Sequence, residues 1–342
     1  MDRIELAPGY SISRVIKGGW QLAGGHGPID ERAALADMGQ FVDAGITTFD
    51  CADIYTGVEA LIGRFVRARG SSETPVQVHT KLVPDRSTLN TFTGADVATA
   101  IERSLRRLGV ERLDLVQFHW WDYDVPRYHD VLAELARIQE QGKIRLLGLT
   151  NFDTARVAAI ADSGIRIASH QVQYSLIDRR PAASMAAVCR ERGIALLCYG
   201  SLAGGFFAER WLGADEPSSP HDNRSLTKYH LIIDEFGGWP LFQELLTVLA
   251  AIARRRGVGI GSVAIRYVLD RPQVAAAIVG ATSARHLQST LQASTLRLDR
   301  DEMHAIEQVL TRARGPAGDV YALERKKGGR HARIMRYELN AR

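Results

Sequence analysis

The chain has 342 residues, of which 46% are hydrophobic and 24% are charged, and its formal net charge is +4. This is ordinary globular composition, and it excludes collagen-like, coiled-coil and disordered chains. No apolar run approaches the ~18 residues of a membrane span, and Asp2, Arg3 and Glu5 stand where a signal peptide would be apolar. We therefore expect a cytoplasmic protein without membrane contacts.

Eight short apolar segments alternate with amphipathic helical patterns between residues 14 and 293, which predicts a parallel sheet. The predicted strands are Val15–Ile16, Thr47–Phe49, Val76–His79, Leu113–Phe118, Arg145–Leu149, Ile167–His170, Ile194–Cys198 and Ala275–Val279. The predicted helices are Asp30–Ala44, Glu59–Arg69, Ala95–Leu108, Val125–Gln141, Thr154–Ala161, Ala182–Arg192, Leu241–Arg256 and Ser262–Leu269. Eight such units favour one (β/α)₈ TIM barrel, an α/β fold, over a doubly wound sheet.

Four segments lie outside this repeat. Ile4–Leu6 and Tyr10–Ser13 predict an N-terminal hairpin across one end of the barrel. Residues 203–240 form a long insertion after the seventh strand, and we hypothesise that it closes over a bound dinucleotide. Leu296–Arg314 predicts a C-terminal helix that begins at Asp299. The predicted organisation is a barrel domain over residues 1–314 and a C-terminal extension over residues 315–342.

The extension is basic, whereas the barrel is neutral. Residues 315–342 contain seven Lys or Arg residues and three acidic residues, which accounts for the whole formal charge of +4. We expect a solvated basic tail and no nucleic-acid partner, because a nucleic-acid binder would carry a basic face through the fold. The cysteines Cys51, Cys189 and Cys198 are odd in number and lack the spacing of metal ligands, which is typical of a reducing compartment.

Polar residues end three neighbouring predicted strands. Asp50 ends the second strand and Tyr55 follows it, Lys81 ends the third strand, and His119 ends the fourth. Singly, these residues would be a helix cap, a loop aromatic, a surface charge and a core histidine. Because active sites of these barrels lie at the carboxyl ends of the strands, the four together favour a catalytic site.

The chemistry of these four side chains is complementary. A Lys ammonium lowers the pKa of a nearby phenol from its reference value of about 10, so Lys81 is expected to lower the pKa of Tyr55. Asp50 would hold Lys81 in its charged form, and a neutral His119 would donate a hydrogen bond to a carbonyl oxygen. We predict that Tyr55 protonates a carbonyl oxygen whose carbon receives a hydride from elsewhere.

The segments FDCADIYTGVEALIGR, VHTKL, LDLVQFHW, LLGLTNF, QVQYSL and CYGSLAGG resemble the aldo-keto reductase superfamily over about residues 10–312. The most specific match is the Asp-x₄-Tyr, Lys and His tetrad, which falls on Asp50, Tyr55, Lys81 and His119. The resemblance implies NAD(P)H-dependent interconversion of a small-molecule carbonyl compound (aldehyde, ketone or sugar) and its alcohol. Tyr55 would be the general acid in reduction and the general base in oxidation.

The nicotinamide needs partners for its carboxamide and its ring face, and the ends of strands five to seven offer them. Thr150, Asn151 and Gln171 can bond the carboxamide, and Tyr199 can stack on the ring. Further contacts with the cofactor are expected from Gly18, Gly19 and Trp20 at the end of strand one and from Asp50 at the end of strand two. Gly19 stands where the family usually has Thr.

The phosphates are expected in two places. The Gly-rich run after Tyr199 either binds the pyrophosphate or is a plain hinge; its candidate residues are Gly200, Ser201, Leu202 and Gly204. After strand eight, the resemblance implies a site for the 2′-phosphate and adenine, at Gly280, Thr282, Arg285, His286 and Thr290. Gly280 and His286 stand at positions that are usually basic in the family, so NADP is expected and use of NAD stays open.

The substrate pocket is predicted to be lined by Trp20, Tyr55, His119 and Trp120. No metal site is expected, because His79 and His119 lie on different strands without a matching set of carboxylates. Two alternatives to a reductase remain at this point. One is a cofactor-binding regulatory subunit of an ion channel with little turnover, and the other is an aldolase-type barrel in which Lys81 forms a Schiff base.

Overall fold

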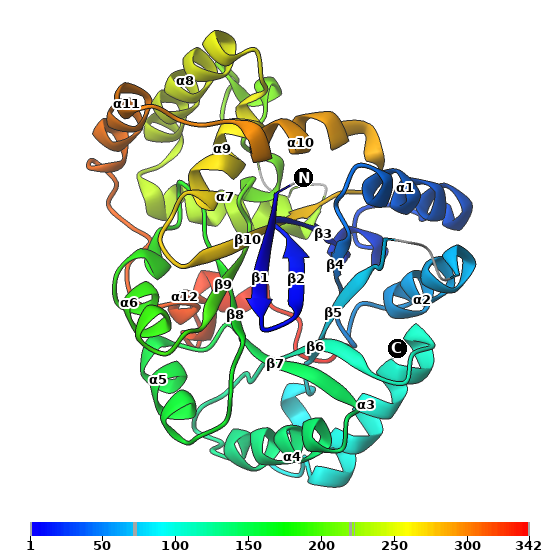
Figure 1. The fold of residues 1–342 in the computed structure, drawn as a ribbon. Coiled ribbons are helices and arrows are strands. Elements are labelled where there is room, and N and C mark those ends of the chain that lie inside the picture. The colour runs from blue at the N-terminus through cyan, green and yellow to red at the C-terminus, as the bar shows by residue number, and fades with distance from the viewer. Residues whose placement is uncertain (1, 71–73, 219–220, 222, 341–342) are drawn as a thin grey trace.

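Eight parallel strands close into a barrel, which confirms the predicted fold. The computed structural model describes residues 2–70, 74–218, 221 and 223–340. Around the barrel the strands pair in the order β10-β3-β4-β5-β6-β7-β8-β9 (Figure 1). Their bounds are β3 Val15–Gly18, β4 Thr48–Asp50, β5 Gln77–Leu82, β6 Leu113–Phe118, β7 Ile144–Thr150, β8 Ser169–Gln173, β9 Ala195–Tyr199 and β10 Val274–Gly280.

Helices surround this barrel, and local sequence signals fix where they begin. Thr93 and Asp96 form a reciprocal capping box at the start of α3, and Asp299 and Glu302 form another at the start of α11. The final helix of the barrel was predicted over Leu296–Arg314. It is shorter, α11 Arg300–Leu310, but it begins directly after Asp299 as predicted. The helices are α1 Glu31–Asp43, α2 Val58–Arg69, α3 Gly94–Leu108, α4 Tyr128–Glu140, α5 Thr154–Asp162, α6 Ser184–Glu191, α8 Trp239–Arg256, α9 Ile260–Leu269, α10 Leu287–Thr295 and α11 Arg300–Leu310.

The predicted N-terminal hairpin is present and covers one end of the barrel. It consists of β1 (Arg3–Ala7) and β2 (Tyr10–Ser13), which lie across the barrel opening in Figure 1. Tyr10 and Ile12 pack into an apolar cluster with inward-facing residues of the strands, and the Tyr10 hydroxyl lies 3.2 Å from His79 Nε2. The hairpin therefore closes the end of the barrel opposite the strand carboxyl termini.

The insertion after β9 contains a helix that the sequence analysis did not assign. Helix α7 (Arg224–Phe236) begins at the N-cap Asn223, follows the short 3₁₀ turns η4 (Ala203–Gly205) and η5 (Glu209–Trp211), and buries Tyr229 and Phe236. Within the described residues, no single helix has the length and hydropathy of a membrane span. Helices α7 and α8 together meet that criterion, but they are bent by 97° relative to each other.

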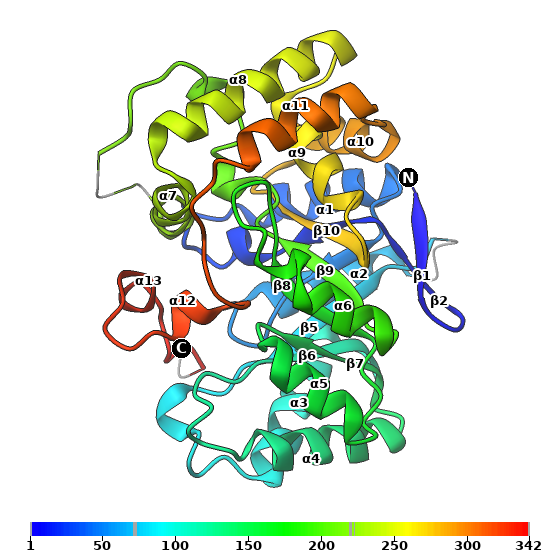
Figure 2. The ribbon, with the colours of Figure 1, turned by 90° about the vertical axis from the view of Figure 1, so that its left-hand side faces the viewer.

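The C-terminal extension is not a solvated tail, so this expectation is wrong. Its short helices α12 (Ala322–Arg325) and α13 (Arg330–Arg333) pack on the side of the barrel opposite the hairpin, as Figure 2 shows. Tyr321, Glu324 and His331 are buried. The basic composition was misleading because several of the charges are paired with the barrel; for example, Arg330 binds Asp234 and Glu235 of α7.

Candidate active site

The four predicted catalytic residues line one cavity at the carboxyl ends of the strands. Asp50 ends β4, Lys81 lies in β5, and His119 directly follows β6. Tyr55 lies in the turn between β4 and α2. The cavity that they share has a volume of about 800 Å³. Their gathering follows from the parallel barrel, which places the carboxyl ends of neighbouring strands side by side.

Asp50 and Lys81 form a buried ion pair at the base of this cavity. Lys81 Nζ lies 2.6 Å from Asp50 Oδ2 and donates a second hydrogen bond to the Cys51 carbonyl oxygen at 2.7 Å. Burial disfavours the ammonium, but Asp50 and its other neighbours outweigh burial and raise the pKa of Lys81. The amides of Gln117 and Gln171 donate to Asp50 Oδ1 at 3.0 and 2.7 Å. Lys81 is therefore held charged and in place.

Tyr55 lies beside this pair. Lys81 Nζ is 5.1 Å from the centroid of the Tyr55 ring, and the Trp20 ring lies 5.1 Å away on a tilted plane. Burial raises the pKa of the Tyr55 hydroxyl, Lys81 lowers it, and Asp50 raises it. The lowering effect of Lys81 on this pKa is therefore as expected, but the effect of burial is larger and the net shift is upward. The physical reason is that desolvation of a phenolate outweighs the attraction of an ammonium whose charge is already shared with Asp50.

The imidazole of His119 is neutral at pH 7. Burial, followed by the charge of Arg325, lowers the pKa of His119 to about 3. Nδ1 lies 3.2 Å from the Thr150 carbonyl oxygen. Because a carbonyl only accepts, Nδ1 carries the proton, which leaves Nε2 of the neutral ring as an acceptor. Nε2 is buried and has no hydrogen-bond partner within the described chain. In this geometry Nε2 would accept a hydrogen bond, so the expected donation from neutral His119 to a carbonyl oxygen needs the other tautomer and stays a prediction.

Aromatic side chains form the wall near these groups, and one of them was assigned wrongly. Trp20 lines the cavity as predicted. Trp120 is fully buried and donates from Nε1 to the Val125 carbonyl oxygen at 2.9 Å, outside the cavity wall. The next residue, Trp121, lines the cavity and packs edge-on against His119 with the ring centroids 4.3 Å apart. Strand β6 ends at Phe118, before Trp120 and Trp121. The alternation of side chains along a strand therefore could not predict which of the two tryptophans lines the cavity.

The candidates for the nicotinamide side lie close together on the cavity wall: Thr150, Asn151, Gln171 and Tyr199. The Tyr199 hydroxyl donates to Asn151 Oδ1 at 2.9 Å. The Gln171 amide donates to Asp50 and to Gln117 Oε1. Consequently Asn151 retains its amide donors and Gln171 retains its carbonyl oxygen, a donor and acceptor pair that matches a carboxamide.

Most of the Gly-rich candidates also face this cavity. Gly18, Gly200, Ser201, Leu202 and Gly204 line it. At Gly200 the backbone has φ +79°, and a Cβ there would lie 2.3 Å from the Tyr229 hydroxyl, so only glycine fits. The buried Ser201 hydroxyl has no partner among the described residues, so it can serve a ligand.

Gly19 does not line the cavity. Its N–H donates to the Asp50 carbonyl oxygen at 2.7 Å, and a Cβ there would lie 2.9 Å from the same oxygen. Its expected contact with the cofactor is therefore replaced by a backbone contact with β4, and the absent Thr side chain would not fit here.

The far end of the same cavity is formed by the residues after β10. The predicted Gly280, Thr282, Arg285, His286 and Thr290 all line it. Gln21, which the sequence analysis did not single out, fills the space over Gly280. Arg285 Nε lies 3.2 Å from His286 Nε2. Further cations line the cavity from the insertion and the tail, namely Arg210, Arg224, Lys228 and Arg336. A cavity with this many cations fits an anionic ligand such as a dinucleotide.

The tail contributes a wall that sequence reasoning missed. Tyr321, Met335 and Leu339 line the cavity, and the Tyr321 ring lies edge-on against His119 with centroids 5.6 Å apart. Four-residue helices leave no periodic pattern, so hydrophobic periodicity could not find this wall. The aromatic and apolar residues scattered through a basic segment were the only available signal.

Comparison with known proteins identifies the family of the chain. Residues 14–311 match the Aldo/keto reductase family. The chain is 27% identical to Protein tas of Escherichia coli over 320 residues, which covers 82% of this chain and 91% of that protein. It is 30% identical to the chloroplastic pyridoxal reductase of Arabidopsis thaliana over 284 residues, with coverage of 78% and 73%.

A solved structure has the same fold. Glycerol dehydrogenase AKR11B4 from Gluconobacter oxydans aligns with a TM-score of 0.78 at 24% identity, covering 93% of this chain and 98% of that chain. At this identity the likeness concerns the fold. The family match, in contrast, spans most of the chain, including all eight barrel strands and every residue of the predicted tetrad. The chain therefore belongs to the aldo/keto reductase family.

Proposed function

We propose that the protein is a nicotinamide-dependent oxidoreductase that interconverts a small-molecule carbonyl compound and its alcohol, with Tyr55 as the general acid and base. The observation that carries this proposal is the buried Asp50–Lys81 pair, with Lys81 Nζ 5.1 Å from the Tyr55 ring, in a cavity large enough for a ligand. Removing two charges from water costs free energy, so a buried ion pair is weak evidence for stability. We therefore infer that this pair serves the proton transfer of Tyr55.

The residues of the cavity fit the cofactor that the family uses. The Asn151 amide and the Gln171 carbonyl oxygen would hold the carboxamide, the Tyr199 ring would cover one face, and the unpartnered Ser201 hydroxyl would meet a phosphate. When bound, the nicotinamide supplies or accepts a hydride at the substrate carbon. We propose NADP as the preferred cofactor, because Arg285 and the other cavity cations favour the additional phosphate.

The protein's own groups then handle the substrate oxygen and its proton. In reduction, the Tyr55 hydroxyl gives its proton to the carbonyl oxygen, and Lys81 stabilises the phenolate that remains. Asp50 keeps Lys81 charged throughout. In oxidation, the alcohol hydroxyl donates its one proton to the phenolate of Tyr55, which acts as the general base.

Fluorescence titration with NADPH and NADH, followed by absorbance assays of NADPH oxidation with a panel of aldehydes, ketones and sugars, tests this proposal. We expect saturable binding of both cofactors, tighter binding of NADPH, and turnover with at least one carbonyl class. Tight binding without any turnover would instead support a cofactor-binding regulatory subunit. Absence of binding would overturn the proposal altogether.

The proposal places the enzyme in the cytoplasm, in keeping with three buried, unpaired cysteines.

A further inference from the structure

The C-terminal segment contacts the two strand ends that hold the His119 imidazole. Arg325 of α12 donates from Nη2 to the Trp120 carbonyl oxygen and from Nη1 to the Asn151 carbonyl oxygen, both at 2.7 Å. Trp120 follows His119 after β6, and Asn151 follows Thr150 at the end of β7. The His119 ring bonds to the Thr150 carbonyl oxygen. The Arg325 guanidinium therefore links the residue after His119 to the residue after Thr150, that is, the residues that follow the donor and the acceptor of this hydrogen bond.

The same segment also contacts the imidazole directly. Tyr321 packs edge-on against His119 at an interplanar angle of 82°. Its backbone has φ +60°, a left-handed conformation that an aromatic residue adopts only when its surroundings impose it. The Arg325 guanidinium lies over the rings of Tyr321 and Tyr123, at 5.0 and 4.2 Å from the centroids. Arg325 and Tyr321 therefore form one packed unit beside His119.

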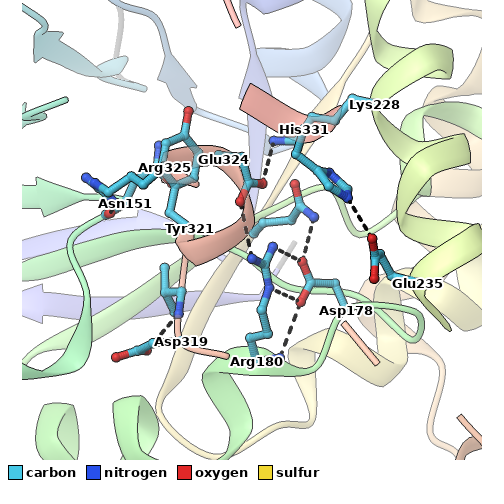
Figure 3. A network of polar contacts seen from close by, with 12 residues as sticks. Asn151, Asp178, Arg180, Lys228, Glu235, Asp319, Tyr321, Glu324, Arg325 and His331 are labelled. Atoms are coloured by element: carbon cyan, nitrogen blue, oxygen red, sulfur yellow. Dashed lines mark hydrogen bonds and ion pairs between the residues drawn. The ribbon is translucent and has the colours of Figure 1, made fainter. Parts of the chain in front are cut away.

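Hydrogen bonds to Asp319 hold this unit on one side, and ion pairs of Glu324 hold it on the other; Figure 3 shows Asp319, Glu324 and Arg180. Before it, Asp319 accepts hydrogen bonds from the Thr154 N–H and hydroxyl, each at 2.8 Å. Next to Arg325, the buried Glu324 accepts a hydrogen bond from Arg180 at 3.2 Å and lies 3.7 Å from Lys228 Nζ. Arg180 is itself held by two hydrogen bonds to Asp178, at 2.9 and 2.6 Å. The segment is thus anchored to the loops after β7 and β8 and to α7.

Backbone carbonyls hold the Arg325 guanidinium, as they also hold that of Arg14. The N–H groups of Arg325 bond to two backbone carbonyls, whereas Arg180 and Arg330 are paired with carboxylates. What distinguishes Arg325 is the place of its two acceptors, since one carbonyl belongs to the residue after His119 and the other to the residue after Thr150, whose carbonyl bonds to the imidazole. The groups that face His119 are this cation, the rings of Tyr321 and Trp121, and the Thr150 carbonyl. The family match ends at residue 311, so this feature lies in the part of the chain beyond it.

We propose that Arg325 is a positioning residue for His119: by clamping the backbone after His119 to the backbone after Thr150, it fixes the ring with Nδ1 protonated and bonded to the Thr150 carbonyl oxygen. Arg325 does not touch the substrate in this role. The effect on turnover rests on the proposed oxidoreductase function, whereas the effect on the imidazole does not. The planar fork of arginine is suited to this task because it holds two acceptors at a fixed spacing.

Nuclear magnetic resonance of protein labelled with ¹⁵N-histidine tests this directly, with the His119 signals assigned from their loss in His119→Gln. In the wild type at neutral pH we expect a single tautomer with protonated Nδ1. In Arg325→Met we expect exchange between the two tautomers, and in Arg325→Lys a change in the same direction, because one ammonium replaces the fork poorly. The matched control is Arg333→Met, on the exposed side of the same segment, which should leave the His119 signals unchanged.

Kinetics provide the second reading. For Arg325→Met we expect kcat to fall on the order of tenfold or more, since small misplacements of an orienting group are costly, while the Kd for NADPH stays within about twofold. Wild-type His119 signals in a folded Arg325→Met protein would overturn the proposal. If this variant does not fold, wild-type signals in Arg325→Lys would overturn it instead. A wild-type protein without any turnover would refute the oxidoreductase function and leave the imidazole signals to decide the role of Arg325.

Discussion

At the scale of single residues, the cavity depends on a few polar groups whose neighbours decide their charge. Burial raises the pKa of the Tyr55 hydroxyl and Lys81 lowers it, and the effect of burial is the larger of the two. A bound ligand that supplies a hydrogen-bonding oxygen to Tyr55 would shift this balance. Single substitutions at Tyr55 and Lys81 therefore separate proton transfer from ligand binding.

Replacing Tyr55 with Phe removes the hydroxyl and keeps the ring against Trp20. We expect turnover to fall on the order of 10² to 10⁴-fold, the usual contribution of a general acid, and cofactor affinity to stay within a few fold. Steady-state assays and NADPH titration measure the two effects. Tyr128→Phe, in a buried tyrosine of α4 outside the cavity, is the matched control and should be kinetically silent. Substantial turnover in Tyr55→Phe would refute the role of the hydroxyl.

Replacing Lys81 with Met leaves Asp50 buried without its ammonium. We expect turnover to be lost and the free energy of unfolding to fall by about 3 to 5 kcal/mol, the usual effect of removing one partner of a buried pair. Urea denaturation measures the stability. The double variant Asp50→Asn and Lys81→Met should recover part of the stability but none of the turnover. Equal stability in the single and the double variant would contradict the buried-pair interpretation.

At the scale of elements, the parts predicted from the sequence are those whose signals are local. Alternating apolar segments identified all eight strands, and Asp299 marked the start of α11. Helix α7 was missed although Leu226, Tyr229 and Ile233 have helical spacing, because the Gly and Pro residues around it suggested a loop. The α12 segment could not be predicted, since its burial depends on Arg180, 144 residues earlier in the chain.

The anchoring of α12 gives a prediction at this scale. Glu324→Gln keeps the shape of the side chain but removes the charge between Arg180 and Lys228, and we expect the free energy of unfolding to fall by about 3 kcal/mol. Thermal and urea denaturation measure this loss. Glu338→Gln, an exposed acid of the same segment, should change stability by less than about 1 kcal/mol. Similar effects of the two substitutions would show that the buried ion pairs do not anchor the segment.

At the scale of the whole molecule, both ends of the barrel contain buried neutral histidines. His79 meets Tyr10 at the hairpin end, and His170 of β8 has its Nε2 2.9 Å from the Phe152 carbonyl oxygen. Burial lowers the pKa of each to about 4. In the unfolded chain a histidine has a pKa near 6.5. Between about pH 6.5 and 4 the unfolded state therefore binds a proton at each of these histidines, whereas the folded state does not. Their contributions to stability are therefore complete above pH 6.5 and decline as the pH falls.

His170→Gln removes one of these groups and keeps an amide donor for the Phe152 carbonyl. Between pH 7.5 and 4.5 the wild type should lose about 2 to 3 kcal/mol of stability relative to this variant. Urea denaturation across this range supplies the two curves. His304→Gln, on the exposed side of α11, should run parallel to the wild type. Parallel curves for His170→Gln as well would mean that His170 has the same pKa in the folded and the unfolded protein.

The place of the α12 segment in the chain has a consequence for biosynthesis. All eight strands precede it, so the growing polypeptide can close its barrel on the ribosome while one wall of the cavity has yet to be translated. The contacts of Arg325 and Tyr321 beside His119 form only when this last segment has docked on the barrel. We therefore expect the barrel to fold before the cavity is complete, and a molecule that has lost the residues after α11 to keep its eight strands without this wall of the cavity.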